Sequence, residues 1–295
     1  NSGITVPIIV MNPEYGMLST LYEYGLEPNI HNFAVLDEVK QLCATNPNKT
    51  YPIHLKMDTG MARYGFQPHQ IQNLISELKL VPNCTVASIF SHLVGSDDAQ
   101  FDSFTMNQIE LFDTMSKQIM AEFPYPIMRH ILNSAGIERF RDYQLDMVRL
   151  GIGMYGISFV NPQACQPIST LKTFVSGIRD MENNASVGYS RKTILKRKSK
   201  IAVIPIGYAD GFNRKLSNGV GTVLIHGKEV PVVGNICMDA AMIDITDVPD
   251  VKLGDEVILF GKDLPVTKMA EKIGTIPYEV MTSIARRVKR VYVYE

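Results

Sequence analysis

The sequence predicts an α/β fold, a (β/α)8-type barrel that is incomplete at its N-terminus, followed by a mostly β C-terminal domain. In the first half, short apolar runs alternate with helical patterns, which is typical of a parallel sheet flanked by helices. After the proline-marked segment 158–167, strand patterns dominate. We therefore expect a barrel portion over residues 1–160 and a β domain over residues 165–295.

Short apolar runs in the first half are expected to be strands, at residues 6–11, 32–36, 52–58, 85–93, 129–133 and 146–153. Helical periodicity lies between several of them, over 69–79 and 104–123. In such folds the chemistry collects at the carboxyl ends of the strands. These runs are too few to close a barrel, so either the sheet is open or upstream sequence is absent from this chain.

The second half contains further predicted strands, at residues 199–207, 221–234, 240–247, 254–261 and 290–295. Gly227 and Lys228 predict a hairpin turn inside the second of these runs. Two helices are predicted near the end of the chain, over 266–274 and over 277–288, where Pro277 stands near the helix start.

The composition limits the kind of partner. A formal net charge of -1 with 20% charged residues favours neither a nucleic acid nor a membrane and points to a small ligand. No apolar run is long enough to span a bilayer, and no signal peptide opens the chain. The cysteines form no CxxC pair, which argues against a disulfide framework or a zinc site and predicts a cytoplasmic protein; they are Cys43, Cys84, Cys165 and Cys237.

Polar side chains follow several predicted strands. In "IHLKMDTGMARYGF" (53–66), an alternating strand ends in two cations and an acid, Lys56, Arg63 and Asp58. His92 follows the next strand. A single strand-terminal histidine is more often a hydrogen-bonded structural residue. Several polar residues on successive strands converge on one mouth of the barrel, which favours an active site.

A second polar group surrounds Arg149, which lies inside an otherwise apolar run. A buried guanidinium needs a ligand or a partner, and an internal salt bridge is the structural alternative. Gly151 and Gly153 free backbone N–H groups to approach an anion, and Ser134, after Asn133 at a strand-to-helix turn, does the same. Together these residues suggest a phosphate-bearing cofactor.

The β domain contributes tyrosines in "VGYSRKT" (Tyr189), "GYADG" (Tyr208) and "PYEV" (Tyr278), together with the segment "CMD" at 237–239. A tyrosine beside glycine is usually a turn or packing residue, so each of them alone is weak evidence for a site.

Taken together, these stretches resemble the alanine racemases, pyridoxal-phosphate enzymes with a barrel followed by a β domain. The motifs "HLKMDTGMARYGF", "SHL", "NSAG", "MVRLGIGMYG", "GYADG", "CMD" and "PYE" occur in order and at family-like spacing from about Gly3 to the C-terminus. The resemblance implies a racemase that interconverts L- and D-alanine through a pyridoxal 5'-phosphate aldimine by a two-base mechanism and supplies D-alanine for bacterial peptidoglycan.

The resemblance also implies cofactor-binding residues. Arg149 is similar to the arginine that contacts the pyridine nitrogen, and His92 to a residue that supports it. An arginine there disfavours protonation of the ring nitrogen and limits side reactions of a long-lived carbanion. The remaining cofactor-binding residues, most of them at the phosphate, are implied to be Asn133, Ser134, Gly151, Ile152, Tyr208 and Tyr278.

On the substrate side, Tyr189 resembles the catalytic tyrosine, with the cofactor-binding lysine of the family as the base on the other face. Arg63 resembles an arginine near the substrate carboxylate, and Lys56 a lysine that is carbamylated in many members. Met238 would offer its backbone N–H to that carboxylate. The residues implied to come from a partner subunit, so that a homodimer shares its active sites, are Tyr189, Cys237, Met238 and Asp239.

The chain departs from the family pattern in four places. The family usually has Gly where Ala62 stands and Gln where Ala240 stands, and "GYSRKT" differs from the commoner wording around the tyrosine. Its Schiff-base lysine lies in a "VVKANAYGHG"-like segment, which is absent here. We therefore expect that the N-terminal portion is missing and that this chain alone is inactive or nearly so, unless a separate piece complements it.

Three alternatives stay open on the sequence. One is a non-catalytic cofactor-binding or scaffold protein derived from a racemase; the retained Tyr189, Arg63 and "CMD" segment weigh against it. Another is a related pyridoxal-phosphate decarboxylase, which would lack the Arg149-type contact. Serine or another small amino acid could also replace alanine as the substrate.

Overall fold

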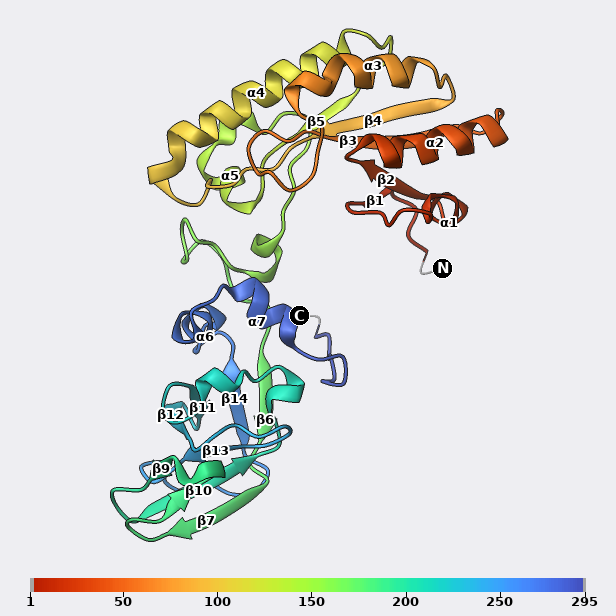
Figure 1. Ribbon diagram of the computed structural model, residues 1–295. Helices are drawn as coiled ribbons and strands as arrows, with labels where there is room; N and C mark the ends of the chain where they lie inside the picture. The colour runs from red at the N-terminus through yellow and green to blue at the C-terminus, as the bar shows by residue number, and fades with distance from the viewer. Residues whose placement is uncertain (1–2, 294–295) are drawn as a thin grey trace. The chain divides into compact units, whose positions relative to one another are not determined.

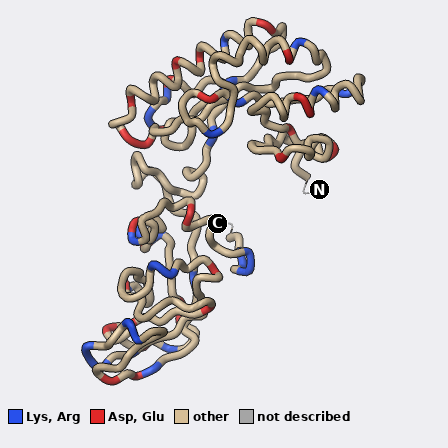
Figure 2. The backbone as a smooth tube through the Cα atoms, in the orientation of Figure 1, with Lys and Arg blue, Asp and Glu red and all other residues tan. Residues whose placement is uncertain are grey.

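The computed structural model describes residues 3–293, which form two compact units (Figure 1). The first, here the barrel unit, comprises residues up to Met154 together with 158–164. The second, here the β unit, comprises 155–157 together with residues from Cys165 onward. Lys and Arg are interspersed with Asp and Glu along the traced chain of each unit (Figure 2). None of the helices in the described part of the chain is long and apolar enough to cross a membrane.

The barrel unit is built on a parallel sheet whose strands follow one another in sequence order. The strands are β1 (Ile8–Val10), β2 (Leu26–Ile30), β3 (Tyr51–Lys56), β4 (Cys84–Phe90) and β5 (Met128–His130). The helices between and after them are α1 (Leu18–Glu23), α2 (Phe33–Thr45), α3 (Ile71–Lys79), α4 (Asp102–Met120) and α5 (Ser134–Arg139). Figure 1 shows α2, α3 and α4 along one side of this sheet. The predicted parallel α/β architecture of this half is confirmed.

The two faces of the sheet differ in chemistry. On β3, Ile53 and Leu55 are fully buried in the hydrophobic core that the helices cover. Successive strand residues point to opposite faces, so His54 and Lys56 point away from the helices. We call that side the inner face. Register places Ser88 of β4 beside His54, after a β-bulge between Ile53 and His54.

One predicted strand is wrong because it begins a helix. The run at 32–36 lies mostly in α2, where the Asn32 side chain accepts a hydrogen bond from the Val35 N–H. Such a cap satisfies a donor that the first helical turn leaves unpaired. The strand at this place is instead β2, which contains Glu27, Pro28 and Asn29 and therefore lacks an apolar pattern.

The predicted strand at 146–153 is also wrong. Asp146 donates its backbone N–H to Arg129 O, and Arg149 donates to Leu132 O. Hydrogen bonds three residues apart cannot form a ladder, which requires alternate residues. The segment therefore runs beside β5 as irregular chain and ends in a 3₁₀ turn over Ile152–Tyr155.

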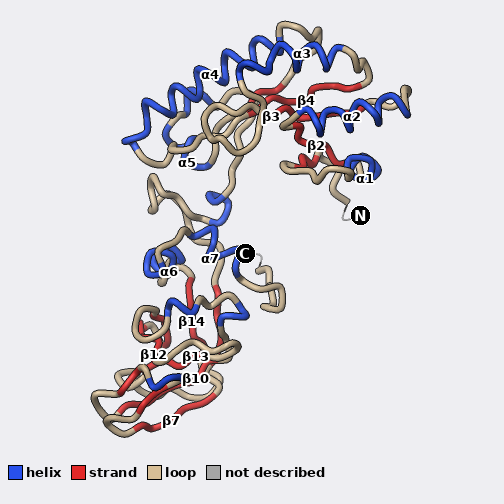
Figure 3. Tube along the Cα trace, viewed as in Figure 1, coloured by secondary structure: helices blue, strands red, loops and turns tan. Residues whose placement is uncertain are grey.

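The β unit is centred on a seven-stranded antiparallel sheet (Figure 3). Its strands, in spatial order, are β6 (Leu171–Phe174), β14 (Glu256–Phe260), β11 (Thr222–Ile225), β12 (Lys228–Val233), β13 (Ala241–Asp244), β10 (Ser199–Ile204) and β7 (Gly177–Met181). A small pair is formed by β8 (Ser186–Val187) and β9 (Thr193–Ile194), and the helices are α6 (Val266–Ile273) and α7 (Pro277–Ser283). The mostly β character of this half is confirmed.

Two details of the β unit correct the sequence prediction. The β11–β12 hairpin turns at His226 and Gly227, one residue earlier than expected, because Ile225 pairs with Lys228. Both turn residues have positive φ, 48° and 72°, as a tight hairpin requires. The predicted strand at 290–295 is not formed up to residue 293, and positions 294–295 lie outside the described residues. There the Arg290 guanidinium donates to nearby backbone carbonyls, including Ala285 O at 2.6 Å.

Candidate active site

The loop after β3 is shaped by its acid and its glycines. One carboxylate oxygen of Asp58 accepts the N–H groups of Gly60, Met61 and Ala62 at 3.0, 3.0 and 3.1 Å. Gly65 has φ 127°, and a Cβ there would lie 2.6 Å from Asp58 N, so only glycine fits. Asp58 is therefore a structural residue, and the candidate functional residues of the segment are its two cations, Lys56 and Arg63.

Lys56 is 5% exposed on the inner face. Its Nζ lies 5.7 Å from the ring centre of Tyr64 and 5.8 Å from that of Phe90. Burial lowers the pKa of Lys56, and the positive charges of Arg63 and Arg149 lower it further. The amine is thereby made easier to deprotonate, and deprotonated it is a nucleophile.

Arg149 is held by main-chain carbonyls. Its guanidinium donates to Ser91 O at 2.5 Å, Ile131 O at 3.0 Å and His130 O at 3.1 Å. It also donates to His130 Nδ1 at 2.5 Å. Burial lowers the pKa of Arg149 to about 10. No carboxylate pairs with it within residues 3–293, so the salt-bridge alternative is not what the structure shows.

The histidine that is hydrogen-bonded to Arg149 is His130, whereas the expected supporting role of His92 stays a prediction. Burial, followed by Arg149 and His54, lowers the pKa of His130 to about 3, so the ring is neutral and accepts the arginine's hydrogen bond. His92 lies close enough to the cations that burial and then Arg149 lower its pKa to about 4. Sequence reasoning missed His130, although it is the polar residue inside the apolar run "HIL".

Ser134 is hydrogen-bonded to the glycine segment that is also predicted to bind phosphate. Its Oγ accepts the Gly151 N–H at 3.0 Å and the Gly153 N–H at 3.3 Å. Asn133 caps α5 by accepting the Gly136 N–H at 2.9 Å. Ile152, between the two glycines, is 4% exposed. Backbone amides and a hydroxyl that cluster in this way suit an anion, so the residues fit a phosphate group.

In the β unit, two predicted segments are joined by hydrogen bonds. Cys237 O accepts the Tyr208 N–H at 3.0 Å, and Met238 O accepts the Ala209 N–H at 2.9 Å. A Cβ on Gly207 would lie 2.3 Å from Cys237 O, so the close approach requires glycine. The N–H of Met238 takes part in no backbone hydrogen bond with the described chain. Asp239 follows on the same exposed turn.

Tyr189 lies on a sharp turn and is 70% exposed. The two residues after it, Ser190 and Arg191, both have positive φ, 62° and 49°. Asn235 fixes the turn by donating its side-chain amide to Tyr189 O at 3.0 Å. Tyr278 is the second residue of α7, after Pro277, and is half exposed.

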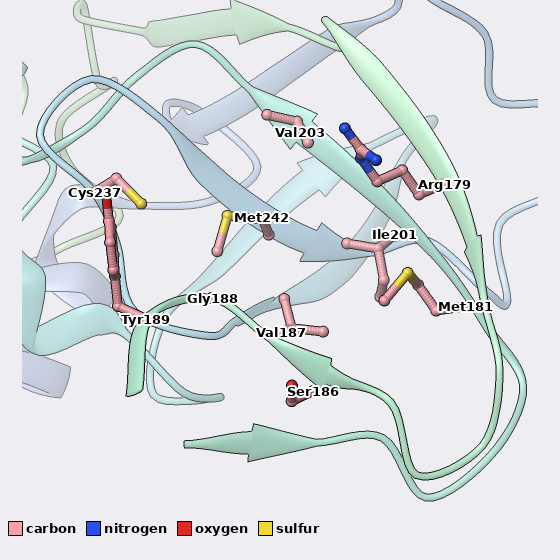
Figure 4. Close-up of a pocket in the computed structure, with 10 residues that line it drawn as sticks. All are labelled: Arg179, Met181, Ser186, Val187, Gly188, Tyr189, Ile201, Val203, Cys237 and Met242. Atoms are coloured by element: carbon pink, nitrogen blue, oxygen red, sulfur yellow. The ribbon is translucent and has the colours of Figure 1, made fainter. Parts of the chain in front are cut away.

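A pocket of about 520 Å³ opens beside Tyr189 (Figure 4). Most of its lining is apolar, and Cys237 contributes to it along with Tyr189. The full lining is Arg179, Met181, Ser186, Val187, Gly188, Tyr189, Ile201, Val203, Cys237 and Met242. Two predicted substrate-side residues therefore share one cavity of the β unit.

The chain thus joins a parallel strand-and-helix unit, which holds an arginine bound by carbonyls and a serine hydroxyl beside backbone amides, to an antiparallel β unit. This is the domain organisation of a barrel-plus-β protein. Residues 1–159 match the family model described as alanine racemase, N-terminal domain, and residues 168–292 match that of the alanine racemase C-terminal domain. The chain belongs to the alanine racemase family, whose members depend on pyridoxal phosphate.

Known members are similar over nearly the whole chain. Alanine racemase 2 of Caldanaerobacter subterraneus subsp. tengcongensis is 39% identical over 99% of this chain and 77% of its own length. The alanine racemase of a D-cycloserine-producing Streptomyces lavendulae superposes with a TM-score of 0.92 at 28% identity, covering 100% of this chain and 80% of that one. That of Bartonella henselae, with covalently bound pyridoxal phosphate, gives 0.85 at 31% identity, covering 98% and 79%.

Proposed function

We propose that the protein is an alanine racemase that interconverts L- and D-alanine with pyridoxal phosphate. The observation that carries this proposal is the Arg149 guanidinium, which is half-buried and bound by carbonyls and a neutral His130, with no carboxylate paired to it in the described part of the chain. When bound, the cofactor stabilises negative charge on the substrate α-carbon. An arginine at its ring nitrogen keeps that stabilisation modest, which suits proton exchange better than bond cleavage.

The barrel unit supplies the anchoring residues in this proposal. Ser134 already accepts two glycine N–H groups, so its own hydroxyl proton can be donated to a phosphate oxygen. The backbone around Gly151 and Ile152 is proposed to complete the phosphate site, where the Gly151 N–H donates to Ser134 and so orients its hydroxyl, and Asn133 fixes the start of α5. For Tyr208 and Tyr278, phosphate binding stays a prediction from the family pattern, as does a supporting role of His92.

Lys56 is proposed to carry a carbamate. The neutral amine adds to CO₂, the new C–N bond forms, and one proton leaves to solvent, so a cation becomes an anion. The lowered pKa of Lys56 supports this step, because it enlarges the neutral fraction. The resulting carboxylate would offset the charges of Arg63 and Arg149, and would hold Arg63 toward the substrate carboxylate.

Tyr189 is proposed to move the proton on one face of the α-carbon, and a lysine on the other. The Met238 N–H, unused by the described backbone, is proposed to bind the substrate carboxylate beside Cys237 and Asp239. Tyr189 and Met238 are largely exposed in a single chain, 70% and 58%. This exposure supports a homodimer in which each subunit lends these residues to the other's site. A cytoplasmic location is supported by the free state of all four cysteines.

The activity is tested on the protein expressed from its gene and loaded with pyridoxal phosphate. L-alanine should yield D-alanine, and D-alanine should yield L-alanine, until both are equal, with serine turned over more slowly. Release of CO₂ from an amino acid without inversion would overturn the proposal in favour of a decarboxylase. Binding of the cofactor without either reaction would favour a scaffold, an alternative that the family comparisons do not favour.

Two further measurements test the site assignments. Protein equilibrated with ¹³C-labelled CO₂ should show a carbamate carbonyl resonance that disappears in Lys56→Ala. Mixing Tyr189→Phe with Arg63→Ala subunits should restore activity, because a dimer with shared sites regains one complete site. If the mixture stays as inactive as its components, the shared-site homodimer is wrong.

A further inference from the structure

We propose that Glu27, His54 and Ser88 are positioning residues for Arg149, and that they act through His130. These five residues form a continuous hydrogen-bonded series on the inner face, here called the inner-face relay. The relay itself rests on contacts within the barrel unit alone. Its consequence for the cofactor rests on the function proposed above for Arg149.

The relay crosses neighbouring strands without a gap. Arg149 donates to His130 Nδ1 at 2.5 Å, and His130 Nε2 lies 3.0 Å from Ser88 Oγ. Ser88 Oγ lies 2.6 Å from His54 Nδ1, and His54 Nε2 lies 2.7 Å from Glu27 Oε2. Ser88 and His130 are 0% exposed and His54 is 1% exposed, so water does not compete for these bonds.

The two ends of the relay fix the direction of every hydrogen bond. Arginine has only donors, so His130 Nδ1 must be an acceptor and its proton must lie on Nε2, facing Ser88. At the other end, an ionised Glu27 has only acceptors, so His54 must carry a proton on Nε2. Burial lowers the pKa of His54, which leaves its Nδ1 free to accept the Ser88 hydroxyl proton. Donation in this one direction, from Arg149 to Ser88 on one side and from Ser88 to Glu27 on the other, satisfies all four hydrogen bonds of the relay only when each histidine carries its proton on Nε2.

This direction explains how the Arg149 guanidinium can be half-buried without an adjacent acid. The Glu27 side chain is 18% exposed, so its charge stays solvated at the rim while the hydrogen bonds polarise one another toward Arg149. If His54 lost its acceptor, its proton would move to Nδ1 and the Ser88 hydroxyl would become an acceptor from both rings. His130 would then be held less firmly, and Arg149 with it.

The first test reads the tautomers directly by ¹⁵N NMR on protein labelled in its histidines, with His54→Gln and His130→Gln used only to assign the signals. At neutral pH we expect both rings to be neutral, with a pyrrole-type Nε2 and a pyridine-type Nδ1. A proton on Nδ1 of either ring, or an imidazolium at either site, would overturn the proposal. The measurement needs no substrate or activity.

The second test changes the far end of the relay. Glu27→Met should move the His54 proton to Nδ1 and weaken pyridoxal phosphate binding by about two- to tenfold, the range of one hydrogen bond. Glu27→Gln, which keeps an acceptor, should restore the wild-type tautomer and most of the affinity. Glu77→Met is the matched control, since Glu77 is also half-buried and ion-paired, with Lys40, but lies outside the relay; it should change neither.

The outcomes separate the two proposals. An unchanged His54 tautomer and cofactor affinity in Glu27→Met would refute the relay, whatever the enzyme does. If the tautomers respond as expected while the wild-type protein neither binds pyridoxal phosphate nor racemises alanine, the relay stands as a structural device and the proposed function fails.

Discussion

The barrel unit and the β unit hold their candidate residues in opposite ways. In the barrel unit, Arg149 makes four hydrogen bonds and its partner His130 is fully buried. In the β unit, Tyr189 and Met238 lie on turns and are 70% and 58% exposed. The first set is fixed by the interior of its own unit, whereas the second is fixed only through its backbone.

This difference predicts at which residues a substitution can change activity without changing stability. A side chain that is exposed and without hydrogen bonds can be changed without loss of folding free energy. A side chain that satisfies several buried carbonyls cannot. Substitutions of Tyr189 and Met238 should therefore act on catalysis alone, whereas substitutions of Arg149 and His130 should act on catalysis and stability together.

The largest effect is expected from Tyr189→Phe. Loss of the hydroxyl should reduce kcat for racemisation by about 10² to 10⁴-fold, the usual contribution of a positioned acid or base. The melting temperature should stay within error of the wild type, because the ring is mostly exposed. A fall in kcat accompanied by clear destabilisation would contradict the separation drawn between the two units.

Arg149→Met should lower stability as well as activity. It leaves carbonyls of Ser91, Ile131 and His130 without their donors, so the free energy of unfolding in urea should fall by about 1–3 kcal/mol. Arg179→Met in the β unit is the matched control, and should change stability by less than about 0.5 kcal/mol. Equal losses of unfolding free energy in the two variants would contradict the stabilising role of the Arg149 hydrogen bonds.

A pH titration sharpens the same contrast. The pKa of His92 is lowered to about 4 from 6.5, so between these pH values the unfolded chain binds a proton that the folded chain does not. The free energy of unfolding is therefore not reduced by His92 above pH 6.5, and it falls as the pH is lowered from 6.5 toward 4. His92→Asn should reduce the slope of unfolding free energy against pH by up to about 1.4 kcal/mol per unit in this window.

The control for that titration is His69→Asn, which removes an exposed histidine and should leave the slope unchanged. If His92→Asn also leaves the slope unchanged between pH 4 and 6.5, then His92 is not kept neutral by burial and by the cations of the site.

The sequence predicted most of the fold because period-two and helical patterns survive wherever one face meets the core. It failed at β2, since Glu27, Pro28 and Asn29 interrupt the apolar pattern. Glu27 is polar because it serves the inner face, so the prediction failed at a residue of the relay. It failed again at 32–36, where the Asn32 cap marks a helix start that the apolar run concealed.

For the site, sequence motifs predicted Arg149, Ser134 and Tyr189. They did not predict the residues of the relay that hold Arg149 in place. The pairing of His54 with Ser88 depends on a β-bulge that shifts the β3–β4 register. That shift is a property of two strands far apart in sequence, and neither strand reveals it alone. Side chains that act through lateral register therefore need the structure, whereas residues in contiguous motifs do not.

The smallest effect is expected at Ala62, on the loop that presents Arg63. Ala62 has φ 54°, a conformation that costs a non-glycine residue about 1 kcal/mol. Ala62→Gly should therefore raise the free energy of unfolding by up to about 1 kcal/mol. Met61→Gly, one residue earlier on the same Asp58-capped turn, should lower it, because Met61 has no positive φ to relieve. Urea titrations of both variants should thus shift in opposite directions, and a shift of both in the same direction would show that backbone strain does not shape this loop.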